Sequence, residues 1–217
     1  MLLYPSDSKL LFYLSKKNYW VFLPRYRGTW ESDGSFLAKP PHIDIIDMID
    51  ELPKGFKDLW SGEVYKIRTP EIYIIGSSFG GTVAILAAKD KRVRRSVAFS
   101  PAINWRIGDN PKELDWLESF TKSAYGNGYR FRREDWNKLR SGKLYDLMAH
   151  VDKLDPKKLF IIHARDDKVV YSRSSEQFSE ELGCKFWELD RGGHFFLSEM
   201  MNPMFSRKIF RFLKAKS

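Results

Sequence analysis

The 217-residue sequence has a single cysteine, only four histidines and no long apolar run. Because Cys184 stands alone, no disulfide can form within the chain and no cysteine zinc cluster can be built. The start of the sequence lacks the basic and apolar segments of a secretory signal, and no run approaches the ~20 apolar residues that a membrane helix needs. We therefore expect a cytoplasmic protein without a membrane partner.

The overall composition is that of an ordinary globular protein, with 43% hydrophobic and 30% charged residues, which excludes disordered and fibrous classes. Lysine and arginine outnumber aspartate and glutamate by 37 to 28, so the net charge is +9. A positive surplus attracts anions in general, but the basic residues are dispersed and no nucleic-acid reading motif is present. We therefore expect no nucleic-acid partner.

Short apolar segments alternate with longer segments of helical period, which predicts an α/β fold with a mostly parallel sheet of about six strands. The predicted strands are Leu2–Tyr4, Trp20–Leu23, Ile72–Ile75, Ser96–Phe99, Leu159–His163 and Phe186–Leu189. The predicted helices are Lys9–Lys16, His42–Leu52, Thr82–Lys89, Ser174–Leu182 and Pro203–Lys214.

The stretch 102–158 interrupts this alternation because it is long, basic and rich in aromatic residues. A connection of this length must contain structure of its own, yet about 55 residues would form only a marginal separate core. We therefore predict one domain over residues 1–217, with a core of 1–101 and 159–217 and a small helical cap inserted at about 102–158.

The pattern G-x-S-x-G occurs at Gly76–Gly80, directly after a predicted strand and before a predicted helix. A sharp turn between the two elements strains the backbone of Ser78 and needs glycine on either side. Such a turn lifts the hydroxyl above the sheet and points a helix N-terminus at a developing oxyanion. A tightly packed helix start is the alternative. A phosphate-binding loop is excluded because Thr82, not lysine, follows Gly81.

A nucleophilic serine needs a base, and the base needs a third group to orient it. His194 follows the last predicted strand in the flexible turn Arg191–His194, from which it can reach a serine above the sheet. The other histidines are less suitable, since His42 opens a helix, His150 lies in the cap and His163 ends an apolar strand. We predict that His194 is the base and that His163 is a hydrogen-bonded, partly buried residue.

Two adjacent carboxylates, Asp166 and Asp167, follow the preceding predicted strand, and either can orient His194. The second carboxylate is then expected to cap the loop or to pair with Arg165. Serine, acid and histidine all lie just past the carboxyl ends of predicted strands, where open α/β sheets build their sites. The pattern predicts acyl transfer by Ser78, which requires no metal and no organic cofactor.

With these motifs the chain resembles the α/β-hydrolase family over almost its whole length. Gly76–Gly80 matches the nucleophile elbow, and Gly193-His194 matches the usual Gly-His pair. Residues 163–170 are similar to the acid-loop pattern H-G-x-x-D-x-x-V, with Ala164 in place of the glycine, and this implies Asp167 as the acid. Residues 24–32 are similar to the loop D-x-R-G-x-G-x-S, with Trp30 where the second glycine usually stands.

The resemblance implies a three-layer α/β-hydrolase-like sandwich that lacks the first two family strands. It also implies an oxyanion hole formed by the backbone N–H groups of Phe79 and Ser6, although the usual H-G-x segment reads Tyr4-Pro5-Ser6 here. Without the missing strands, Trp20–Leu23 becomes an apolar sheet edge, and exposed edges invite pairing with another chain. We therefore expect a homodimer contact along this edge.

Within the family, the chain is similar to esterases, to dienelactone-hydrolase-like enzymes and to the catalytic domains of prolyl-oligopeptidase-type peptidases. The function that we expect is hydrolysis of small carboxylic esters through an acyl-enzyme, with the substrate pocket lined by Tyr26, Trp30 and Trp105. The alternatives are a small peptidase or amidase, which would take a peptide substrate, and a non-catalytic binding protein on the same fold.

Overall fold

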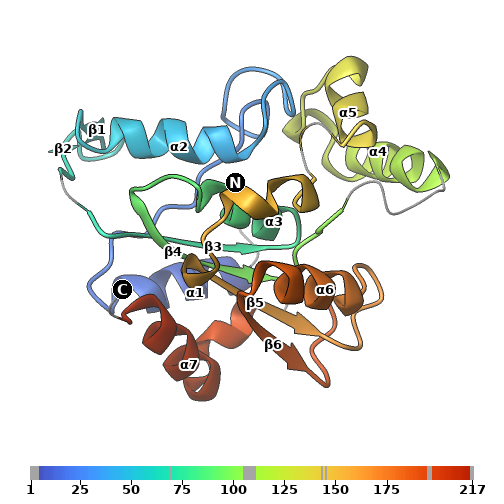
Figure 1. Cartoon of the computed structure of the whole chain (residues 1–217). Coiled ribbons are helices and arrows are strands. Elements are labelled where there is room, and N and C mark those ends of the chain that lie inside the picture. Colours follow the sequence, from blue (N-terminus) through green and yellow to red (C-terminus); the bar gives the residue numbers. More distant parts are fainter. Residues whose placement is uncertain are drawn as a thin grey trace.

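Four parallel strands form a sheet through the middle of the computed structural model, in the order β3-β4-β5-β6 (Figure 1). The structure describes residues 5–68, 70–104, 111–142, 144, 146–194 and 197–215. The strands of this sheet are β3 (Ile72–Ser77), β4 (Val93–Phe99), β5 (Leu159–Ala164) and β6 (Lys185–Leu189). Each contains one of the predicted strands, so the predicted α/β class with a parallel sheet is confirmed.

Helices cover both faces of the sheet because the side chains of a strand alternate between its two faces. On one face, Val97 and Phe160 pack with helices α1 (Pro5–Ser15) and α7 (Pro203–Leu213). The 3-10 helix η4 (Leu197–Met201) joins the same apolar cluster.

On the other face, Ala98 and Ile161 pack with helices α2 (His42–Glu51), α3 (Phe79–Ala87) and α6 (Ser172–Leu182). The five helices α1, α2, α3, α6 and α7 correspond to the five predicted ones, with ends that differ by a few residues. The molecule therefore has a helix–sheet–helix arrangement, as expected for a sheet that is buried on both faces.

The segment predicted to form the cap contains helices α4 (Pro111–Tyr125) and α5 (Arg133–Arg140), which lie beyond α3 in Figure 1. The 3-10 helix η1 (Gly126–Gly128) separates these two helices, and the 3-10 helices η2 (Met148–Lys153) and η3 (Pro156–Lys158) follow them. Trp136 and Leu139 of α5 are buried in the same apolar cluster as α2 and α3.

The prediction of a strand at Trp20–Leu23 was wrong. The segment forms no strand, and both it and β3 line an apolar cavity of about 650 Å³. Within the described residues, Trp20–Leu23 therefore takes no part in the hydrogen-bonded sheet. The predicted strand Leu2–Tyr4 lies outside the described residues, so the sheet has four strands within them instead of about six.

A short antiparallel hairpin of β1 (Phe56–Lys57) and β2 (Val64–Tyr65) was not predicted. Each of its strands has only two residues, which is too short for a pattern of alternation to be recognised. Within the part of the chain that the structure describes, no helix is both long enough and apolar enough to span a membrane.

Candidate active site

Ser78 lies in the sharp turn between β3 and α3, with backbone angles φ 53° and ψ −120°. A non-glycine residue with positive φ is strained, and the surrounding structure must hold it in place. The turn also requires glycine at position 76, because a Cβ there would lie 2.0 Å from the carbonyl oxygen of Gly80. Gly80 itself has more room, since the nearest atom to an added Cβ is the Tyr26 hydroxyl at 3.6 Å. The steric need for glycine is therefore confined to the first of the two predicted positions.

The side chain of His194 lies between Ser78 and Asp167. Its Nε2 is 3.0 Å from Oγ of Ser78, and its Nδ1 is 2.7 Å from Oδ2 of Asp167. With the proton on Nδ1, the imidazole donates to the carboxylate and accepts the hydroxyl proton of the serine. The His194 side chain is 5% exposed and that of Asp167 is fully buried, so water competes little for these contacts.

Asp167 is held by hydrogen bonds on both carboxylate oxygens. Oδ1 accepts the backbone N–H groups of Val169 and Val170, at 2.8 and 3.0 Å. Burial acts to raise the pKa of Asp167, but the hydrogen bonds from His194 and from these two N–H groups outweigh it and hold the pKa below its ordinary value. The carboxylate is therefore ionised at neutral pH.

Asp166 has a different partner from its neighbour. Its Oδ1 accepts the backbone N–H groups of Gly192 and Gly193, at 2.9 and 2.8 Å, so it ties down the loop that carries His194. Of the two roles expected for the second carboxylate, it takes the loop cap and not the pairing with Arg165. The guanidinium of Arg165 pairs with Glu188 and Asp190 instead.

His163 also contacts Asp167, and nothing in the sequence pattern indicated this contact. Its Nε2 lies 3.1 Å from Oδ2 of Asp167 and 2.9 Å from the carbonyl oxygen of Val170. Its Nδ1 lies 2.8 Å from Oγ of Ser175, and the residue is completely buried, not partly buried as predicted. Burial lowers the pKa of His163. The ring is therefore neutral, with Nε2–H donating and Nδ1 accepting the serine hydroxyl.

The profile of the alpha/beta hydrolase family matches residues 3–204 of the sequence. The chain belongs to the α/β-hydrolase family. A search among curated proteins finds no match. Among solved structures, an esterase from Pyrococcus furiosus is similar with a TM-score of 0.67 and 21% identity, over 95% of this chain and 74% of that one.

Two further structures are similar over most of their length. A lipase-esterase related protein from Clostridium acetobutylicum has a TM-score of 0.61 and 19% identity, over 94% of this chain and 88% of that one. A carboxylesterase structure from Nitrososphaera gargenis has a TM-score of 0.61 and 17% identity, over 94% and 84% of the two chains. At these identities the likeness concerns the α/β-hydrolase fold.

The two residues predicted to form the oxyanion hole of this α/β hydrolase lie on different helices. Phe79 begins α3 directly after Ser78, and its ring packs against Tyr26 and Phe36, each with 5.5 Å between ring centroids. Ser6 lies in the first turn of α1, which packs against η4, the helix that starts three residues after His194.

A largely apolar cavity of about 650 Å³ reaches the nucleophile elbow of the α/β hydrolase from the side of β3. Tyr26 and Trp30 line it, as do Ser77 and Gly80 on either side of Ser78. Trp105, the third predicted pocket residue, lies outside the described residues. Tyr129 of the cap segment also lines the cavity, and this residue was not predicted. A β-bridge to Thr29 holds Tyr129 beside the loop that carries Trp30.

Proposed function

We propose that this α/β hydrolase is a serine enzyme that cleaves small carboxylic esters. The observation that carries the proposal is the pair of contacts of His194, at 3.0 Å to the Ser78 hydroxyl and 2.7 Å to the Asp167 carboxylate. Both distances are those of hydrogen bonds, so one proton can pass from the serine to the imidazole while the carboxylate stabilises the charge that results.

In the proposed reaction Ser78 attacks the ester carbonyl while His194 takes the hydroxyl proton. The backbone N–H groups of Phe79 and Ser6 would stabilise the oxyanion, and one such donor contributes roughly 3–4 kcal/mol to transition-state binding. His194 then returns the proton to the leaving alcohol, and an acyl-enzyme remains on Ser78. Water, activated by the same imidazole, hydrolyses this intermediate.

The cavity beside the elbow supports an ester substrate with an apolar acyl group. Its lining is mostly apolar and includes Tyr26 and Trp30 as well as the elbow residues Ser77 and Gly80. That two of the similar structures are named an esterase and a carboxylesterase is a further reason to propose an ester rather than an amide substrate. We further propose that residues 1–217 act as one unit in which 102–158 caps the site.

The test is labelling by a fluorophosphonate probe together with hydrolysis of nitrophenyl esters of increasing acyl length and of aminoacyl amides. Ser78→Ala should abolish labelling and lower kcat by about 10⁴–10⁶. Ser77→Ala is the matched control, because the Ser77 hydroxyl is buried without a hydrogen-bond partner among the described residues. Labelling that survives Ser78→Ala would overturn the proposed nucleophile, and faster cleavage of amides than of esters would overturn the substrate class.

A further inference from the structure

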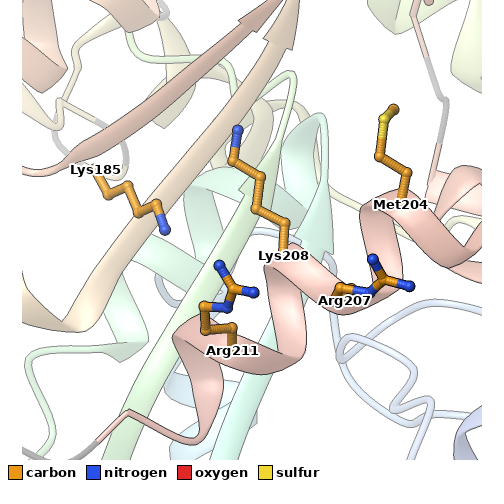
Figure 2. Close-up of a pocket in the computed structure, with 5 residues that line it drawn as sticks. All are labelled: Lys185, Met204, Arg207, Lys208 and Arg211. Carbon is orange, nitrogen blue, oxygen red and sulfur yellow. The ribbon is translucent and has the colours of Figure 1, made fainter.

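A second cavity, of about 450 Å³, lies where strand β6 meets helix α7. Lys185, the first residue of β6, lines it from the strand. Met204, Arg207, Lys208 and Arg211 line it from α7, where their spacing of three and four residues places them on one face of the helix. Figure 2 shows Lys185 reaching toward the helix, while Lys208 and Arg211 reach from the helix beside it.

The four cations of this cavity, Lys185, Arg207, Lys208 and Arg211, form no salt bridge with another described residue. Among the described residues, no carboxylate oxygen lies within 4.0 Å of any of their nitrogen atoms. The exposed Arg165, in contrast, pairs with both Glu188 and Asp190. The cavity therefore holds a concentration of positive charge that no carboxylate of the described residues neutralises by direct pairing.

Burial and the neighbouring cations act in the same direction on the two lysines. Burial, Arg211 and Arg95 together lower the pKa of Lys185. Burial and Lys185 lower the pKa of Lys208. Since like charges disfavour one another, an anion in the cavity would relieve the repulsion and gain attraction from several cations at once.

Aromatic rings fix the positions of the two lysines. The ammonium of Lys208 lies 3.4 Å from the ring centroid of Trp187, and that of Lys185 lies 4.5 Å from the ring centroid of the fully buried Phe160. A cation that already rests on a rigid ring loses less conformational entropy when a ligand binds than a freely solvated lysine does. The charges are therefore arranged before any ligand arrives.

We propose that this cavity binds a phosphate group carried by a small organic molecule. The planar guanidinium of Arg211 presents paired N–H donors that match two phosphate oxygens, and the lysines supply point charges. Met204 and the alkyl stems of the basic side chains offer an apolar surface for the organic part. The shared chemistry is a phosphomonoester, whether it comes free in solution or as the headgroup of a lipid.

The cavity is separate from the proposed catalytic residues. Lys185 begins β6, whereas the loop with His194 follows the end of the strand at Leu189. Four residue steps separate the two ends, which is about 13 Å. Phosphate binding therefore does not depend on the proposed ester hydrolysis, and either proposal can fail without the other.

The test is calorimetric titration with phenyl phosphate, and cosedimentation with phosphatidylcholine vesicles that contain phosphatidic acid, both at constant ionic strength in chloride. We expect either that one phenyl phosphate binds per protein chain or that the protein cosediments with the vesicles. The double variant Lys185→Gln/Arg211→Gln should weaken that binding by about tenfold or more, because it removes two charge-assisted contacts. The matched control is Lys91→Gln/Arg133→Gln, which removes the same charge from two exposed positions without a salt bridge among the described residues.

Binding of phenyl phosphate alone supports a free ligand, and binding of the vesicles supports a lipid source. Binding of neither, or an equal loss in the control variant, overturns the proposal. The ligand-free double variant should also melt at the same or a higher temperature than the parent protein, since like charges have been removed. A markedly lower melting temperature would show that the cations serve the fold, and this result also overturns the proposal.

Discussion

His163 and His194 donate to the same carboxylate oxygen, Oδ2 of Asp167, at 3.1 and 2.7 Å. Of these two histidines, His194 also contacts Ser78, whereas the other ring nitrogen of His163 contacts Ser175. Each N–H donor that Asp167 accepts stabilises its negative charge. His163 therefore acts on the proposed reaction through Asp167, as a positioning residue.

Replacing His163 by phenylalanine should change the pH dependence of hydrolysis. Without the Nε2–H donor, the Asp167 charge is less stabilised, so it attracts the proton on His194 more strongly. The acid limb of the kcat/KM profile should therefore move to higher pH. We expect kcat to fall about tenfold with little change in KM.

His163→Gln is the informative partner variant, because its amide keeps an N–H donor. It should restore most of the parent pH profile. If both variants lose stability equally while the acid limb stays in place, His163 serves only the packing of the core.

Asp167→Asn and Asp166→Asn should differ greatly in their effects on catalysis. The first change places an amide against Nδ1 of His194 and favours the wrong tautomer, so kcat should fall by about 10⁴. The second keeps the Oδ1 acceptor for the Gly192 and Gly193 N–H groups, so only a few-fold loss is expected. Steady-state kinetics on one nitrophenyl ester will distinguish them. A larger loss from Asp166→Asn would reverse the assignment of the acid.

Gly76→Ala should prevent the turn at Ser78 from forming. The added Cβ would lie 2.0 Å from a backbone oxygen that cannot move without breaking the start of α3. We expect destabilisation of about 3 kcal/mol or more and loss of ester hydrolysis. Gly80→Ala is the control, since its Cβ has only a contact of 3.6 Å with a side chain and alanine favours the helix. Urea denaturation of the two variants makes the comparison, and equal stability would refute the steric argument.

Asp135 couples the stability of the fold to pH. It is 1% exposed and accepts hydrogen bonds from Lys138, Ser35 and Arg132. Burial opposes its ionisation, yet these bonds lower its pKa from 3.8 to about 2. A carboxylate whose pKa is lowered on folding stabilises the protein above its ordinary pKa, and this contribution is lost as the pH falls through the folded value.

Asp135→Asn should therefore lower the free energy of unfolding by about 1–2 kcal/mol near neutral pH, and the difference from the parent should shrink between about pH 4 and pH 2. Urea denaturation at several pH values measures this. Glu134→Gln, at the adjacent exposed position, should leave the free energy of unfolding nearly unchanged. A deficit that stays constant down to pH 2 would show that charge plays no part.

The four parallel strands could be predicted because strands that are covered by helices on both faces are short, nearly continuous apolar runs. The same rule failed at Trp20–Leu23, since an apolar run does not reveal whether another backbone lies beside it. The positions of the motifs placed Ser78 and His194 just after the carboxyl ends of two predicted strands, and these strands prove to be the two outer strands of the described sheet. The motif positions did not reveal that His163 meets Asp167, because that contact depends on the tight turn in which Oδ1 of Asp167 accepts two N–H groups.

The acid illustrates a second limit. From the residues alone Asp166 and Asp167 were equivalent, because adjacent side chains differ only in the direction in which the turn points them. The structure separates them through their partners, the loop N–H groups for Asp166 and the imidazole for Asp167. The resemblance to the family's acid loop had implied Asp167, and the physical reason for it lies in the three-dimensional path of the chain after β5.

The homodimer through Trp20–Leu23 stays a prediction, but strand pairing no longer supports it. The support now comes from exposed apolar side chains, since Trp20 is 59% and Leu23 43% exposed. The rings of Phe56 and Tyr65 pack against Trp20, with 6.0 and 5.2 Å between ring centroids. On the adjoining hairpin Trp60 is 93% exposed. Contiguous exposed apolar side chains of this kind mark interaction surfaces.

Light scattering at micromolar concentration should give the mass of a dimer. Trp20→Ser with Leu23→Ser should shift it to the monomer, because each large apolar side chain that the contact buries contributes about 1.5–3 kcal/mol. Trp116→Ser, which changes a tryptophan that is 65% exposed on α4, should leave the dimer intact. A monomeric parent protein, or a dimer that survives the double change, would show that this surface does not join two copies of the chain.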